Sequence, residues 1–577
     1  MSAAIEVPDI SVDEPNPAVS HARTAYSREQ IASILLQIES GKDRKISQRE
    51  QAREIGIPES TIRYWAHFKP TCDLEPETRA FLESPAGIRF LHRQTIAMLF
   101  VFGLMGGCGP SLLRLFLQLT GLASQVACSD TTLRTRMRRL LDVVVTWGKQ
   151  TGAHLASTMA VRNVSLGVDE TFFAKMVLVA MDVAAGFIFL EKSSEKRDVD
   201  TWAKCIQSGM EGLKVNVIQV VGDHAKALCA LAKDRLGIPK VEDLWHGQNA
   251  ITRGTVGSLA AKANAARDAF EKACEQRERV ARSKEDYQRQ AHGRGHPPNW
   301  AARELRAKQE VDIAERRLER ATENQELMRQ SVCDLGNILH PIDLKTGALQ
   351  DATKVESELH KAFEQMDRVV KEANLGERGQ TAVDKARRLI PSWSASVKLW
   401  RTMVNECLSD LALSAEVLTL VSTVLIPLLY LKRVILQRRD TEGRKSLQEV
   451  QKRFQSELRD PDGLWRMLPL ALRRSLLATA QDCVDLFQRS TGCVEGRNGV
   501  LSLHQHQMRG LNPRVLCSLT VVHNYVITRS DGTTAAMRFF GRAPDQPLFE
   551  HLCQVLPLPA RPRKRHRKHK EDLIFAE

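Results

Sequence analysis

The sequence predicts a mixed α/β core that is split by a long all-α insertion and preceded by an all-α region. The first sign is a change in the apolar period, which is helical up to about residue 160 and strand-like from about residue 163. The second is a set of five short apolar segments, with helical segments between the later ones. The third is residues 257–332, which are densely charged and rich in Ala at helical spacing.

Residues 26–70 resemble a helix-turn-helix. Ser47 can cap a first helix, with Glu50 three residues further on, and Gly56 supplies the turn. A second helix is expected to start at Ser60 or at the next residue. It would direct three side chains toward a DNA major groove: Thr61, Arg63 and Tyr64. A plain helical hairpin is the alternative.

Residues 71–160 are expected to form a helical linker. An apolar segment, Ile96–Leu104, is followed by a break rich in Gly at 106–110. Ser129 then opens a helix that carries four arginines: Arg134, Arg136, Arg138 and Arg139. This basic helix is a second candidate for DNA contact. A solvated helix face packed on the neighbouring domain is the alternative.

Five segments with strand-like patterning make up the expected core sheet. They are Asn163–Asp169, Met176–Val183, Gly186–Glu191, Val215–Val221 and Val241–Trp245. A tight turn at Ala185-Gly186 joins the second and third, and helices are expected at about Asp198–Gly212 and Ala225–Leu236. The order β-β-β-α-β-α-β resembles the ribonuclease H-like fold, a mixed five-stranded sheet flanked by helices.

The all-α insertion covers residues 251–484. Its first part is broken at His292–Pro298, which predicts two long antiparallel helices. Trp393 and Trp400 are expected in the insertion core, the alternative being that one of them stacks on an unpaired base. The apolar run Val417–Leu431 is shorter than the roughly 20 residues that span a bilayer, so we expect a buried helix.

Two acids follow apolar strands, Asp169 after the first and Asp223 after the fourth. In a ribonuclease H-like sheet these strands are neighbours, so their ends bring the two carboxylates together. Hard cations such as Mg²⁺ prefer oxygen ligands, and two of them can activate the attacking oxygen and stabilise the leaving oxygen at phosphorus. Each Asp alone is equally consistent with a turn or a helix cap. Glu170 should point to the opposite face of the strand, and Asp182 is expected to be a structural acid.

The segment Cys493–Leu511 resembles the final helix of the DDE transposase and integrase superfamily, and Glu495 takes the place of the family's catalytic Glu. Downstream, Leu519–Tyr525 and Asp531–Gly541 resemble the segment with which many bacterial insertion-sequence transposases close this domain. Ala535 stands where the family usually has Pro, which is a small departure.

A further resemblance lies in Asp243-Leu-Trp-His246, which is similar to the "C/DxxH" signature that follows the second Asp in hAT and Mutator-like transposases. It implies that His246 lies near the scissile phosphate, and a packed core histidine is the alternative. Several transposase groups carry a helical insertion between the second Asp and the Glu, which fits the long interval here. Three residues of the final helix are candidate contacts to the DNA backbone, with a solvated helix position as the alternative for each: Arg497, Asn498 and Arg509.

Together these resemblances imply a DNA transposase that binds terminal inverted repeats and catalyses DNA strand cleavage and strand transfer. Two Mg²⁺ or Mn²⁺ ions would be held by Asp169, Asp223 and Glu495, with His246 as a fourth catalytic residue. The expected partners are double-stranded DNA, at the repeats and the target, and further copies of the chain in a dimer or larger synaptic assembly, without a membrane. A transposase-derived DNA-binding regulator and a structure-specific nuclease stay open as alternatives.

Charge and cysteine content agree with this expectation. The chain has 83 Lys and Arg against 69 Asp and Glu, a formal net charge of +14, which favours a polyanionic partner. The cysteines form no CxxC pair, so we expect reduced thiols in a cytoplasmic, nucleoid-associated bacterial protein. The N-terminus lacks the apolar core of a signal peptide. The remaining expected boundaries are a flexible tail at 1–25, the two parts of the core at 161–250 and 485–550, and a basic tail at 551–577.

Overall fold

The computed structural model describes residues 26, 28–43, 46–67, 75–173, 175–290, 295–411, 413–508, 511–558 and 560–562. The expected N-terminal tail, most of the basic C-terminal tail and Arg509 lie outside these ranges. The chain divides into two compact units. One consists of Met1–Val144 and Gln546–Glu577, and the other of Val145–Asp545.

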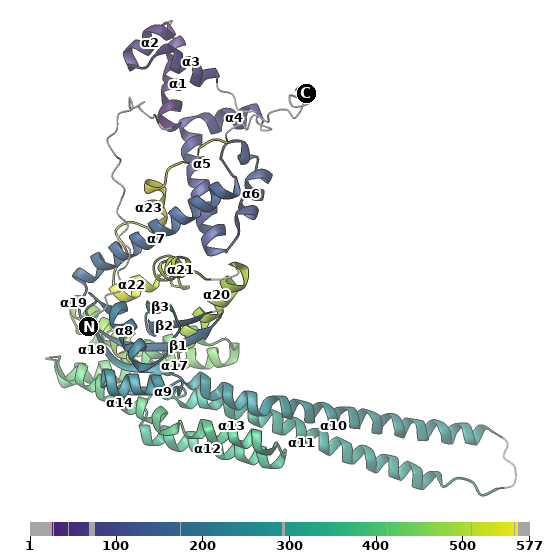
Figure 1. Cartoon of the computed structure of the whole chain (residues 1–577). Coiled ribbons are helices and arrows are strands. Elements are labelled where there is room, and N and C mark those ends of the chain that lie inside the picture. Colours follow the sequence, from purple (N-terminus) through teal and green to yellow (C-terminus); the bar gives the residue numbers. More distant parts are fainter. Residues whose placement is uncertain are drawn as a thin grey trace. The chain divides into compact units, whose positions relative to one another are not determined.

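All the regular secondary structure described in the first unit is helical (Figure 1). Its elements are α1 (Arg28–Asp43), α2 (Gln48–Ile55), α3 (Glu59–His67), α4 (Pro76–Glu83), α5 (Pro85–Ala97), the π-helical η1 (Met98–Met105), α6 (Pro110–Leu119), the short η2 (Leu122–Ser124), the first half of α7 (Asp130–Thr158), and α23 (Leu548–Val555). The helix α23 packs against α5, where Arg93 and Glu550 form an ion pair of 2.6 Å. Residues 551–555, expected in a basic tail, therefore belong to a helix of this unit.

The helices α1 to α3 agree in outline with the helix-turn-helix expectation. Ser47 caps α2 by accepting the Glu50 N–H at 3.2 Å. Gly56 ends α2 in the left-handed conformation at φ 73°, which a residue with a side chain rarely adopts. The helix α3 starts at Glu59, slightly earlier than expected, and Ile62 packs into a small core shared with α1 and α2.

The second unit is built on a mixed five-stranded sheet with the order β3-β2-β1-β4-β5. The strands are β1 (Arg162–Phe172), β2 (Met176–Asp182), β3 (Ile188–Ser194), β4 (Val215–Gly222) and β5 (Lys240–Glu242). The pairs β1–β2 and β2–β3 are antiparallel, whereas β1–β4 and β4–β5 are parallel. The connections carry α8 (Val199–Met210), α9 (Lys226–Ala230) and the π-helical η3 (Leu231–Leu236). The expected five-stranded mixed sheet is confirmed.

Two details of the sheet follow from side-chain capping. Asp182 accepts the N–H groups of Ala184 and Ala185, both at 3.2 Å, and Gly186 completes the turn at φ 73°. Asp182 is therefore the structural acid that was expected. The expected fifth strand is too long, because Asp243 ends it by capping the next helix through the Trp245 N–H at 2.7 Å.

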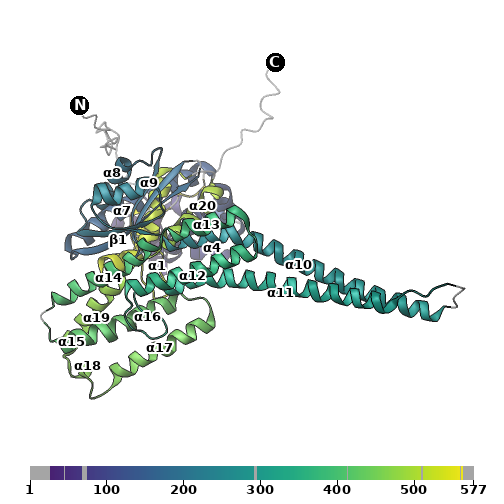
Figure 2. The ribbon, with the colours of Figure 1, turned by 90° about the horizontal axis from the view of Figure 1, so that it is seen from below.

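A helical insertion lies between β5 and α20 (Gly492–Met508). Its elements are α10 (Leu244–Arg289), α11 (Trp300–Ile338), α12 (Ala352–Glu372), α13 (Gly376–Arg387), α14 (Ile390–Ser409), α15 (Ala415–Leu420), the π-helical η4 (Val421–Leu425), α16 (Ile426–Gln437), α17 (Thr441–Arg459), α18 (Leu464–Met467) and α19 (Leu470–Asp485). As expected, α10 and α11 run side by side as a long antiparallel pair, which extends beyond the other helices of this unit (Figures 1 and 2).

The two tryptophans of α14 lie in the core of the insertion. Trp393 and Trp400 are buried, and their indole N–H groups donate to the carbonyl oxygens of Glu242 and Cys483. The alternative that one of them stacks on an unpaired base is wrong, because neither ring is accessible. Two helical stretches, Pro85–Met105 and Ala415–Gln437, are long and apolar enough to cross a membrane. The second contributes buried residues to the insertion core, as expected for the apolar run within it.

After the insertion the chain returns to the sheet. The helix α20 contacts β1 and β2, and α21 (Pro513–Tyr525) contacts β3. The Asn524 side chain fixes α21 by bonding both the N–H and the carbonyl of Ile188, at 2.9 and 3.0 Å. The helix α22 (Ala535–Phe540) then packs its two phenylalanines against Phe187. These contacts show how residues after the insertion become part of the sheet unit.

Candidate active site

Asp169 and Asp223 lie on neighbouring parallel strands. Gly167 of β1 is aligned with Val221 of β4, so the same register continued by two residues sets Asp169 opposite Asp223. Asp223 follows directly after β4, as expected. Asp169 does not end β1, and that expectation is wrong, because β1 continues along β2 as far as Phe172.

Glu495 and His246 form a cluster with Asp169. Glu495 lies in the first turn of α20, and His246 lies at the start of α10. One ligand atom from each of the three residues lies within 4.8 Å of the other two. His246 Nε2 is 3.5 Å from Glu495 Oε1. Two helix N-termini thus meet at this edge of the sheet, and their partial positive charge favours anionic groups.

Asp223 is not a member of this group of three. Its Oδ1 accepts the Ala225 N–H at 3.1 Å, which makes it a turn former just before α9. It is nevertheless close enough for its charge to raise the pKa of Asp169. Asp223 therefore both forms the turn before α9 and lies close to Asp169.

The environment of Asp169 opposes its ionisation. Burial is the largest cause, followed by the charge of Glu495, and together with Asp223 they raise the pKa of Asp169 to about 8. The Glu170 N–H, which donates to Asp169 Oδ1 at 2.9 Å, acts in the opposite direction. A bound cation would relieve this repulsion, because it favours the ionised carboxylates. The donor set, two carboxylates and an imidazole, suits a divalent metal ion.

This geometry predicts that the contribution of Asp169 to the free energy of unfolding of the metal-free protein falls as pH rises from about 4 to about 8. In that window Asp169 is protonated in the folded state and ionised in the unfolded state, so the folded state binds one proton more. Raising the pH removes protons from solution and therefore favours the unfolded state. Denaturant unfolding in the presence of a chelator, near the two ends of this window, measures the effect. Asp169→Asn should show a smaller fall, by roughly 1–3 kcal/mol, and an unchanged fall would contradict the prediction.

Asn498 orients Asp169 and does not face solvent. Its Nδ2 donates to Asp169 Oδ2 at 2.8 Å, and the residue is buried. The Asn498 amide is thus used inside the site, and its contact with the DNA backbone stays a prediction.

Arg497 is buried in an ion pair. Its Nε and Nη2 donate to the two carboxylate oxygens of Glu191 at 2.8 and 2.7 Å, and Thr520 donates to the same carboxylate. The expected DNA contact of Arg497 is wrong, because a guanidinium enclosed by protein cannot reach a phosphate. Sequence reasoning missed Glu191, although an acid closing the apolar segment Gly186–Glu191 signals a need for a buried partner.

Asp243 ties the two ends of the insertion together. Its side chain is fully buried, and its Oδ2 accepts both the N–H of Thr491, at 3.0 Å, and the Thr491 hydroxyl. Thr491 directly precedes α20, whereas Asp243 directly precedes α10. This link holds the starts of the two helices that carry His246 and Glu495.

The other candidates lie apart from the cluster. As expected, Glu170 points away from Asp169, where it accepts hydrogen bonds from Arg197 and Trp202. In the first unit, Tyr64 and Arg63 have exposed side chains on α3, Arg63 pairing with Glu59, and Thr61 is half-buried. Their DNA contacts stay predictions.

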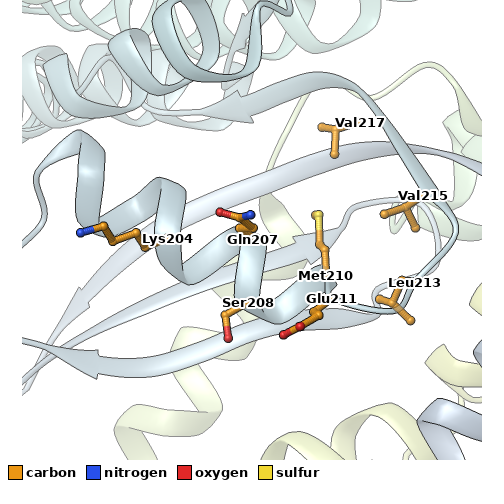
Figure 3. A pocket seen from close by; sticks show the side chains of 8 residues that line it. All are labelled: Lys204, Gln207, Ser208, Met210, Glu211, Leu213, Val215 and Val217. Atoms are coloured by element: carbon orange, nitrogen blue, oxygen red, sulfur yellow. The ribbon is translucent and has the colours of Figure 1, made fainter. Parts of the chain in front are cut away.

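A pocket of about 570 Å³ lies elsewhere on the sheet unit (Figure 3). It is lined by one face of α8 and by the start of β4: Lys204, Gln207, Ser208, Met210, Glu211, Leu213, Val215 and Val217. Asp223 follows the other end of β4, so this pocket does not include the carboxylate cluster. Its lining offers no group of metal-ligating side chains.

Part of the chain matches a protein family whose function is unknown. No curated protein and no solved structure matches the chain. Residues 421–568 match a family described as "Family of unknown function (DUF6399)". The matched segment includes Glu495 and the helices that close the sheet unit, whereas Asp169, Asp223 and His246 lie outside it.

Proposed function

We propose that this protein is a DNA transposase of the DDE type, which cleaves and joins DNA strands with divalent metal ions held by Asp169, Asp223 and Glu495. The observation that carries the proposal is the cluster of Asp169, His246 and Glu495, whose ligand atoms lie within 4.8 Å of one another. Asp169 was expected in the site from the strand pattern, and Glu495 and His246 from the resemblance to the transposase family. They come from a strand and two helices that the insertion separates in the chain.

The topology supports a ribonuclease H-like core. The first strand is central, two antiparallel strands lie on one side of it, and two parallel strands lie on the other. The insertion leaves after β5 and ends before α20, so the last acid of the set can return to the first strand. This is the arrangement that the resemblance to insertion-containing transposases implies.

The residues around the cluster would each have a distinct task. When bound, two Mg²⁺ or Mn²⁺ ions supply activation of the attacking oxygen and stabilisation of the leaving oxygen. Asp169, Asp223 and Glu495 would hold them, and Asn498 keeps Asp169 oriented by its hydrogen bond. His246 Nε2 has no hydrogen-bond partner among the described residues, so it can donate to a phosphate oxygen.

Recognition of DNA is assigned to the first unit and to basic surfaces. The helix α3 presents Arg63 and Tyr64, and α7 presents Arg134, Arg138 and Arg139 as exposed cations. Such side chains bind phosphates and release condensed counterions, so binding should weaken with salt. Joining two element ends requires more than one active site, which favours a dimer or a larger assembly.

The test uses labelled DNA from the regions that flank the protein's own gene, with Mg²⁺ or Mn²⁺. Wild-type protein is expected to nick at a repeat boundary and to join the freed 3′ end to target DNA. Asp223→Ala should abolish both steps and retain DNA binding. Specific binding without any cutting would favour a regulator, and cutting without joining would favour a nuclease.

A further inference from the structure

We propose that His224, Cys229 and Glu242 form a second metal site, which takes a thiophilic divalent cation such as Zn²⁺. His224 follows β4, Cys229 lies in α9, and Glu242 ends β5. One ligand atom from each lies within 4.8 Å of the other two. The set shares no residue with the Asp169 cluster, and the inference does not depend on the proposed transposase activity.

The parallel pairing of β4 and β5 creates this site. Gly222 is aligned with Glu242, so the chain leaving β4 toward His224 starts at the edge where Glu242 lies. His224 Nδ1 is 2.8 Å from Glu242 Oε1. The Glu242 backbone is held from the other side, since its N–H donates to Ser392 Oγ at 3.2 Å and its carbonyl accepts the Trp393 indole at 3.0 Å. The carboxylate is therefore preorganised, which favours ligand binding.

The donor types select the kind of ion. An imidazole nitrogen, a thiolate sulfur and a carboxylate oxygen are all accepted by Zn²⁺ in a tetrahedral arrangement, with water as a fourth ligand. Thiolate is a poor ligand for Mg²⁺, so this set differs in metal preference from the Asp169 cluster. The His224 side chain is 75% exposed while Glu242 is 9% exposed, which provides a solvent entry to a buried carboxylate.

The Lys240 ammonium competes with a metal ion for the Glu242 carboxylate. Its Nζ lies 2.8 Å from Glu242 Oε1, and both side chains are 9% exposed. In the metal-free protein the ammonium neutralises the buried carboxylate, and an incoming cation has to displace it. Lys240→Met removes the competing charge without removing a ligand, so metal affinity should rise at least about tenfold.

The experiment titrates full-length, chelator-stripped protein with Co²⁺ and follows the thiolate-to-cobalt charge-transfer absorption. Wild-type protein is expected to show this band, which saturates when one Co²⁺ fills this site, and to lose it when Zn²⁺ is added; Co²⁺ held by the carboxylates of the other cluster gives no thiolate band. Cys229→Ser should abolish the band. Two controls should keep it: Cys333→Ser, which removes an exposed thiol on α11, and Asp169→Asn, which alters the other cluster.

Two outcomes would overturn the proposal: no thiolate band in the wild-type protein, or a band that survives in Cys229→Ser. If Cys229→Ser does not fold, Lys240→Met decides, since tighter Co²⁺ binding supports the site and unchanged binding rejects it. DNA cleavage is not the readout. A failure of this site and a failure of the transposase proposal are therefore distinguishable.

Discussion

Glu495→Gln is expected to lower the rate of metal-dependent DNA strand cleavage by at least about 10³-fold, which corresponds to about 4 kcal/mol of transition-state stabilisation. The substitution keeps the size of the side chain and removes its charge. It therefore takes one carboxylate ligand from the cluster with Asp169 and His246. The measurement is the single-turnover rate of nicking on labelled repeat DNA in Mg²⁺, with DNA binding measured separately and expected to be retained.

Glu495→Cys separates metal ligation from a structural role at this position. A thiolate accepts Mn²⁺ more readily than Mg²⁺, so cleavage should partly recover in Mn²⁺ and stay low in Mg²⁺. Glu323→Gln is the matched control, because Glu323 is an exposed residue of α11 outside the cluster. Wild-type rates for Glu495→Gln in Mg²⁺ would remove this carboxylate from the proposed site.

Arg497→Met is expected to lower the free energy of unfolding by about 3–5 kcal/mol. The guanidinium makes two hydrogen bonds to Glu191, and the two side chains are 4% and 0% exposed. Its removal leaves the buried Glu191 carboxylate with the Thr520 hydroxyl as its remaining side-chain partner among the described residues. Denaturant unfolding of the variant and the wild-type protein at neutral pH measures the loss.

The paired replacement distinguishes a buried charge from lost packing. Arg497→Met combined with Glu191→Leu should recover most of the stability, because no uncompensated charge stays in the interior. Arg329→Met is the control, since Arg329 and Glu326 form a similar pair on the surface of α11 with side chains 66% and 59% exposed. Its cost should be much smaller, because solvent screens an exposed ion pair. An equal cost for Arg497→Met and Arg329→Met would contradict the argument.

Much of the fold follows from local patterns. Alternating and continuous apolar segments located all five strands, and the charged segment broken near residue 295 located the helix pair α10 and α11. The position of Asp223 just after β4 was also predicted correctly, and the parallel pairing of β1 with β4 brings Asp169 beside it, although β1 continues past Asp169. Glu495 and His246 were found through resemblance, since nothing local to either residue marks it as a neighbour of Asp169.

The errors have a common cause. The family resemblance implied that Arg497 and Asn498 contact the DNA backbone, yet both side chains are buried and bonded to acids of the sheet. The strand β1 was ended too early because pairing with β2 carries it beyond its apolar residues. In each case a neighbour distant in the sequence supplies the burial or the hydrogen bonds.

By itself the sequence determined the sheet, its helical interruption and the position of Asp223 after the fourth strand, because each of these is encoded in the spacing of apolar residues along a short segment. Only the tertiary structure decided which polar groups become partners. It paired Arg497 with Glu191, joined Asp243 to Thr491, and brought His224, Cys229 and Glu242 together without any cysteine motif. Such contacts depend on how separate elements pack, and a burial pattern within one element does not specify which residue lies opposite.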